Sequence, residues 1–141
     1  MSRFSIRVSA IALSLFGLAS YANAGDLEVQ VTGISQIKGD VFVSLFNQKN
    51  QWLKKAVVGQ KSTVDKGKLV LKFIDLPEGE YAISAYHDLN SNGALDTNPI
   101  GIPKEPYGFS NDAAGNFGPP SFDDAKIKVE GKLTTTTLRL N

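Results

Sequence analysis

Apolar and polar side chains alternate along most of the chain after residue 26, and this period-two pattern restricts the fold more than any other feature. In LEVQVTGI, for example, Leu27, Val29 and Val31 fall on one face and polar residues fall on the other. An amphipathic helix would instead repeat its apolar residues three and four positions apart, so the pattern predicts strands. Strands are predicted over residues 27–34, 39–47, 68–76, 80–87, 125–130 and 132–141.

The segment 51–67 is less regular. Its first half, QWLKKAVV (51–58), fits either a seventh strand or one short helical turn. We expect extended structure there, followed by a loop. About seven strands with short links predict a single-domain antiparallel β-sandwich of the Greek-key kind, similar in architecture to transthyretin or an immunoglobulin domain.

The first 24 residues are predicted to be a signal peptide. Arg3 and Arg7 precede the apolar stretch VSAIALSLFGL, which is too short to span a bilayer, and the tripeptide ANA ends at Ala24. We expect cleavage after Ala24 and export of residues 25–141 to the periplasm or to the outside of the cell. The alternative is an uncleaved membrane anchor.

Composition excludes several classes of function for the mature chain. Without Arg3 and Arg7, the 15 basic residues become 13 against 14 acidic ones, a net charge of −1, so nothing favours nucleic acid or anionic lipid as a partner. The chain has no cysteine, which excludes disulfides, thiol chemistry and zinc–cysteine sites. No second apolar stretch is long enough to be an integral membrane segment.

The segment 88–120 interrupts the strand pattern. Its 33 residues contain five of the six prolines and five of the 13 glycines in the chain. Connections of this length inside a compact domain are uncommon and are usually functional or disordered. We expect an ordered loop that caps one end of the sandwich and forms the functional surface, because the segment contains apolar residues that can pack: Leu95, Ile100, Ile102, Tyr107, Phe109 and Phe117.

The start of this segment, DLNSNGALD, has the spacing of a calcium-binding loop. Side-chain oxygens recur at the first, third and fifth positions, and a glycine at the sixth allows a sharp reversal. The candidate metal ligands are the side chains of Asp88, Asn90, Asn92 and Asp96 and the backbone carbonyl of Ala94. Position twelve is Pro99 instead of the glutamate of an EF-hand, so Glu105 or Asp112 would have to complete the shell.

A polar turn explains the same residues without an ion. Aspartate and asparagine at alternate positions form Asx turns, and Asn92-Gly93 is a common reversal. The sequence leaves both interpretations open. A calcium ion, if bound, would be held weakly, on the order of 10⁻⁴ to 10⁻³ M, and would stabilise the loop instead of performing catalysis.

Four further residues are candidates for a ligand-binding surface: His87, Glu105, Tyr107 and Phe109. His87 is the only histidine. We expect it to be a hydrogen-bonded residue that anchors the loop, and the alternative is a hydrolase that uses it with Asp88 or Asp96. No nucleophile motif of the GxSxG type is present, so no catalytic residue is assigned. The two aromatic residues would suit a sugar or a peptide, or they would close the open end of the sandwich.

Two stretches, IDLPEGEYAISAYHDLNSNGALDTNPIGIPKEPYGFSNDA and GPPSFDDA, resemble the diagnostic core of a family of small exported bacterial proteins known as domain of unknown function 2141. The resemblance covers nearly all of the mature chain. It implies a signal peptide and a β-sandwich, and it implies no activity and no catalytic residues. DLPEGEYAI is more loosely similar to a strand entry of transthyretin-like and collagen-adhesin B-type sandwiches, some of which bind calcium at comparable loops.

Together these features predict an exported, non-enzymatic binding or structural module. Its functional surface is expected to be the 88–120 loop. Ca²⁺ is the one candidate cofactor, and the partner is expected to be a protein or a glycan. The alternatives are a small periplasmic hydrolase that uses His87 and a carbohydrate-binding module that uses Tyr107 and Phe109.

Overall fold

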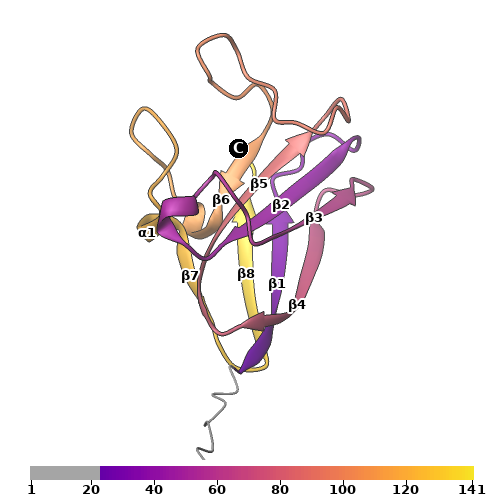
Figure 1. Cartoon of the computed structure of the whole chain (residues 1–141). Coiled ribbons are helices and arrows are strands. Elements are labelled where there is room, and N and C mark those ends of the chain that lie inside the picture. The colour runs from indigo at the N-terminus through magenta and orange to yellow at the C-terminus, as the bar shows by residue number, and fades with distance from the viewer. Residues whose placement is uncertain (1–22) are drawn as a thin grey trace, which may run out of the picture.

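The computed structural model describes residues 23–141, and the predicted signal peptide lies outside them except for its last two residues. Figure 1 shows two facing β-sheets, which confirms the predicted all-β sandwich. One sheet has the strand order β4 (Leu69–Pro77), β1 (Ala24–Thr32) and β8 (Leu133–Arg139). The other contains β3 (Val58–Thr63), β2 (Asp40–Phe46) and β5 (Gly79–Asp88), with β6 (Tyr107–Phe109) and β7 (Lys126–Val129) both paired to the far edge of β5.

Three short helical elements complete the fold: η1 (Lys49–Gln51), η2 (Ser110–Asp112) and α1 (Phe122–Ala125). Ser121 caps α1, because its hydroxyl accepts a hydrogen bond from the Asp124 backbone N–H. None of the helices in residues 23–141 has the length and apolar character needed to cross a bilayer.

The core lies between the sheets and is filled by the alternating residues that the sequence places on one face. Leu27 of β1 pairs with Phe73 of β4, and Val43 of β2 pairs with Ala85 of β5. All four of these side chains are buried. The inward-facing set supplies the hydrophobic stabilisation on which a cysteine-free domain depends.

The sequence predicted an antiparallel sandwich, but one strand pair is parallel. β1 runs parallel to β8, with Val29 opposite Thr136. A parallel pair needs a long crossover between its strands, and here nearly the whole chain lies between them. The alternation of residues within one strand does not show which distant strand it pairs with, and β1 and β8 are not neighbours in a hairpin.

The expectation for residues 51–67 was wrong. Residues 49–54 form a helical turn, and the strand β3 follows at 58–63, where a loop was expected. The turn is favoured because it places Trp52 against Phe46, at 5.0 Å between ring centroids, and against Phe122. This contact builds a second apolar cluster on the outer face of the five-stranded sheet.

The segment 88–120 is ordered as expected, but it is interrupted by β6 and η2. β6 inserts between β5 and the end of the chain, where Tyr107 and Asn141 exchange backbone hydrogen bonds of 3.4 and 3.0 Å. Its central residue, Gly108, lies so close to Arg139 that an added Cβ would be 2.0 Å from the Arg139 carbonyl oxygen. A three-residue strand is too short to produce a visible alternation.

Candidate functional site

β5 ends in two fully buried polar residues, His87 and Asp88. His87 lies on the inner face, opposite Val41 of β2. Its Nε2 is 2.7 Å from the carbonyl oxygen of Lys38, so this nitrogen carries the hydrogen and donates it, while Nδ1 has no partner. The His87 backbone N–H donates to the Pro106 carbonyl at 2.8 Å. The histidine therefore joins two loops to the strand and is not exposed to a ligand.

The carboxylate of Asp88 organises the turn that follows it. One oxygen accepts the Asn92 backbone N–H at 3.1 Å, and the other accepts the Gly93 N–H at 2.7 Å. Gly93 has a φ of 81°, a conformation that suits glycine. On the other side of Asp88, Gly39 approaches so closely that a Cβ would be 2.1 Å from the Asp88 carbonyl oxygen.

Asn90, Asn92 and Asp96 form a second layer of hydrogen bonds. The side-chain oxygens of Asn90 and Asn92 accept the backbone N–H groups of Asn92 and Ala94, which makes two consecutive Asx turns. These bonds fix the orientation of both amides, so that their NH₂ groups donate to the two Asp96 oxygens at 2.6 and 2.8 Å. The network is satisfied internally.

This arrangement does not present the oxygen shell that calcium requires. Ca²⁺ takes six to eight oxygens, whereas amide nitrogens of Asn90 and Asn92 face Asp96, and backbone donors occupy both oxygens of Asp88. In residues 23–141, no group of three or more His, Cys, Asp or Glu side chains converges in a way that could hold a metal ion. The geometry therefore fits the Asx-turn interpretation better than an ion site.

Addition of calcium is accordingly expected to leave the stability unchanged. The melting temperature at ~10 mM Ca²⁺, well above the dissociation constants of weak extracellular sites, should agree within about one degree with that in chelator. Ligand at about 100 times its dissociation constant would add about 2.7 kcal/mol and raise the midpoint by several degrees. A rise of that size, abolished by Asp96→Ala, would establish the ion site and contradict the hydrogen-bonded arrangement.

Glu105 is buried and holds two parts of the 88–120 segment together through its carboxylate. It is 7% exposed, and its two oxygens accept the backbone N–H groups of Leu89 at 2.9 Å and Asp96 at 3.0 Å. Glu105 thus ties the return of the segment to its start. The Tyr86 hydroxyl adds a bond to the Gly93 carbonyl at 3.3 Å. Burial raises the pKa of Tyr86, and the charges of Asp88 and Glu105 raise it further, so the hydroxyl stays protonated at neutral pH.

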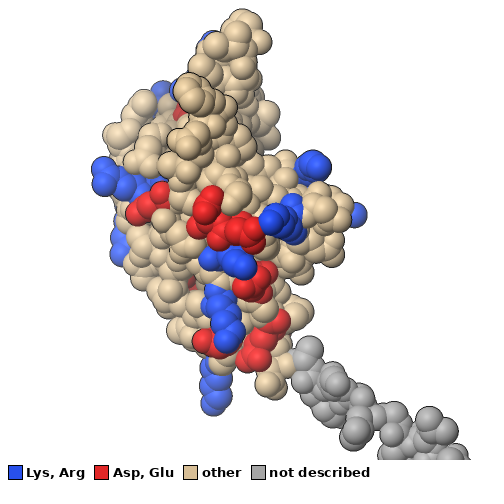
Figure 2. All heavy atoms as spheres, turned by 90° about the vertical axis from the view of Figure 1, so that its left-hand side faces the viewer, with Lys and Arg blue, Asp and Glu red and all other residues tan. Residues whose placement is uncertain are grey.

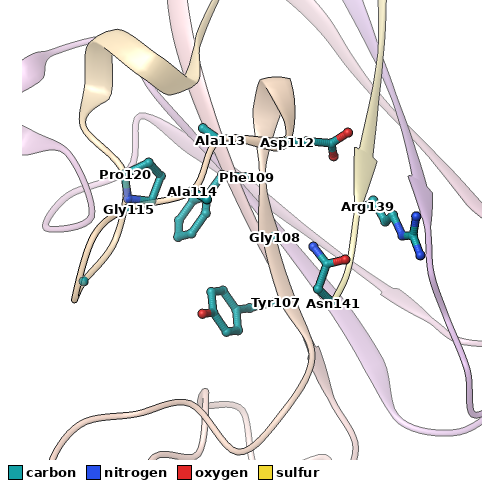
Figure 3. A pocket seen from close by; sticks show the side chains of 11 residues that line it. Tyr107, Gly108, Phe109, Asp112, Ala113, Ala114, Gly115, Pro120, Arg139 and Asn141 are labelled. Atoms are coloured by element: carbon teal, nitrogen blue, oxygen red, sulfur yellow. The ribbon is translucent and has the colours of Figure 1, made fainter.

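Tyr107 and Phe109 lie together, as the sequence suggested, with ring centroids 5.9 Å apart. They line a crevice of about 310 Å³ at β6. Figure 3 shows their rings on the side of β6 that faces Pro120, whereas Arg139 and Asn141 lie on the other side. Tyr107 is 38% exposed, while Phe109 is anchored against Trp52 at 5.8 Å.

The wall opposite the two rings was not predicted from the sequence. It consists of small residues between Ala113 and Pro120, and Trp52 holds it in place because its indole N–H donates to the Pro120 carbonyl at 2.8 Å. Asp112 also lines the crevice. Buried Ser110 was missed as well; its hydroxyl accepts the Ile83 N–H at 2.9 Å and fixes the chain beyond β6. The roles of Trp52, Ser110 and this wall depend on contacts with residues distant in the sequence, so the sequence alone does not show them.

One family model matches the chain, over residues 29–137, and its description is "uncharacterized protein conserved in bacteria (DUF2141)". The match includes β5, the Asp88–Asp96 turn and the whole crevice except for its C-terminal wall. No curated protein and no solved structure matches significantly.

Proposed function

The chain belongs to the bacterial DUF2141 family, and we propose that it acts as an exported, non-enzymatic binding module whose ligand surface is the 88–120 segment. The observation that carries the proposal is the pair of buried carboxylates, Asp88 and Glu105, whose four oxygens all accept backbone N–H groups of this one surface segment. Burial of a carboxylate is costly unless hydrogen bonds compensate it. Two carboxylates bonded in this way fix the backbone conformation of the loop, and a fixed conformation favours specific binding of a ligand.

The crevice is the part of this segment best suited to a ligand. Its volume of about 310 Å³ falls at the lower end of the range for small-molecule sites, which fits one or two sugar rings. The exposed ring of Tyr107 offers an apolar face on one side of β6, and Asp112, Arg139 and Asn141 offer hydrogen-bond donors and acceptors on the other side. This combination favours a neutral carbohydrate over a nucleic acid, which would need a basic surface.

A hydrolase has less support. The His87 ring is fully buried with its Nε2–H engaged, and both oxygens of Asp88 accept backbone hydrogen bonds. Neither group is within reach of a substrate at the surface. A general base must contact the proton that it removes, directly or through one water molecule.

Binding to a panel of neutral oligosaccharides, followed by calorimetry, tests the proposal. Tyr107→Ala should weaken the affinity for any glycan that binds by about tenfold or more, because it removes the exposed aromatic contact. The control is Ile74→Ala, which removes a 65% exposed apolar side chain from the other sheet and should bind normally. Equal affinity of Tyr107→Ala and the native protein, or no binding to any glycan, would contradict the carbohydrate assignment.

A further inference from the structure

We propose that two tips of the 88–120 segment insert into the surface of a neutral lipid bilayer. The first, called here the isoleucine tip, comprises residues 97–103, and the second, the phenylalanine tip, comprises residues 113–119. Both rise at the end of the sandwich where β5 ends (Figure 1). This proposal goes beyond the crevice, although the phenylalanine tip includes the small residues that form one wall of it.

The tips expose apolar side chains to an unusual degree. Among the large apolar side chains of the described residues, Phe117 and Ile100 are the most exposed, Phe117 fully and Ile100 at 80%, and Ile102 is 55% exposed. The backbone of Phe117 has a φ of 58°, which a non-glycine residue adopts only at a cost. Scattered exposed apolar residues are normal, but both tips that carry these three residues lie in the upper half of the molecule in Figure 1.

Neither tip contains a charged residue. Their sequences are TNPIGIP and AAGNFGP. Figure 2 shows that the part projecting above the sheets is mainly uncharged, whereas basic and acidic side chains alternate lower down the same face. Ion pairs join Lys126 of β7 to Glu80 of β5 and to Asp123 of α1, outside both tips. Charges that enter a bilayer are expensive, so their absence from both tips permits insertion.

Four backbone N–H groups of the isoleucine tip, those of Asn98, Ile100, Gly101 and Ile102, find acceptors within the tip. The N–H groups of Ile100 and Ile102 donate to the Asn98 side-chain oxygen at 3.1 and 2.9 Å, and that of Gly101 donates to the Asn98 carbonyl at 2.9 Å. The Asn98 N–H donates to the Ile102 carbonyl at 2.9 Å, and the two prolines have no N–H. Asx turns of this kind also form in water, so the bonds permit insertion without requiring it. A turn that enters an apolar medium needs such bonds.

A bilayer fits these tips better than a protein partner. Protein interfaces draw their affinity from aromatic and arginine anchors, chiefly Trp, Tyr and Arg, surrounded by a polar rim. The tips contain none of these three residue types and project as separate points. They also contain no Lys or Arg, so the association should not depend on anionic lipid or on salt.

Flotation of the full-length mature chain with phosphatidylcholine vesicles tests this inference. The native protein should float with the vesicles, to the same extent at low and high salt and with or without added phosphatidylglycerol. The combined variant Ile100→Ser, Ile102→Ser and Phe117→Ser should float at least about tenfold less. The matched control, Val70→Ser with Ile74→Ser, replaces side chains that are 54% and 65% exposed on the outer face of β4 and should float normally.

A fluorescent probe reports insertion independently of the serine variants. Phe117→Trp should show a blue-shifted emission with vesicles and quenching by lipids with brominated acyl chains, against the background of half-buried Trp52. Three results would each overturn the proposal: absence of flotation and of quenching, equal flotation of the serine variant, or binding to anionic vesicles alone. In the first case a protein partner would be the remaining occupant of the tips. Tyr107→Ala should float normally, so failure of the glycan assignment and failure of the lipid assignment are distinguishable.

Discussion

Asp88→Ala is expected to lower the free energy of unfolding by about 3 kcal/mol, because the backbone N–H groups of Asn92 and Gly93 lose a charged acceptor. In a domain of this size the midpoint should fall by roughly 10 °C. Chemical denaturation in the presence of a chelator measures the effect, so that loss of a bound ion cannot account for it. Asp88→Asn should cost about half as much, since it keeps the volume and one accepting oxygen.

Asp65→Ala is the control, because Asp65 is an exposed aspartate outside the 88–120 segment. It should change the free energy of unfolding by less than about 0.5 kcal/mol. If Asp88→Ala also stayed within about 1 kcal/mol of the native protein, the buried carboxylate would not be holding the segment, and the turn would have to be stabilised in another way.

Gly108→Ala should be comparably damaging, for a steric reason. The new Cβ would be 2.0 Å from the carbonyl oxygen of Arg139 and 3.2 Å from a methyl carbon of Leu138. Since the nearer atom belongs to the backbone, it cannot rotate away, and β6 must separate from β8. We expect a loss of about 3 kcal/mol, measured by denaturant unfolding, and loss of ligand binding in the crevice that β6 lines.

Gly118→Ala provides the matched control within the same segment. No atom lies within 4 Å of the position that its Cβ would occupy, and its φ is not in the left-handed region. Substitution there should be neutral or slightly stabilising, by up to about 1 kcal/mol. Equal stability of the Gly108 and Gly118 variants would show that β6 is not packed against β8 as described.

The strands of the core could be predicted because each shows its alternation locally. β1, β4 and β5 bury alternate residues over most of their length, and their predicted bounds differ from the observed ones by only a few residues. β3 has no fully buried residue, so its pattern is weak, and the preceding residues fitted either a strand or the helical turn that forms. The parallel pairing of β1 with β8 depends on residues more than a hundred positions apart.

The residues of the site were largely identified from the sequence, but their roles were not. His87 and Glu105 were candidates for a ligand-binding surface because binding groups concentrate in and beside long loops, although an anchoring role was the preferred interpretation of His87. Both are buried, since their partners come from Lys38 and from the far side of the Asp88 turn. The amide orientations that argue against calcium follow from the Asx turns. Spacing alone cannot distinguish an oxygen that faces an ion from one that faces a backbone N–H.

Hydrogen exchange of the native protein, resolved by residue, tests the central claim most directly, namely that the buried carboxylates fix the shape of the 88–120 segment. The amides of Leu89, Asn92, Gly93 and Asp96 all donate to Asp88 or Glu105. They should exchange at least about 100-fold more slowly than in an unfolded chain, although they lie outside any strand. Exchange of these four amides at unfolded-chain rates, while those of β1 and β2 stay protected, would contradict the account.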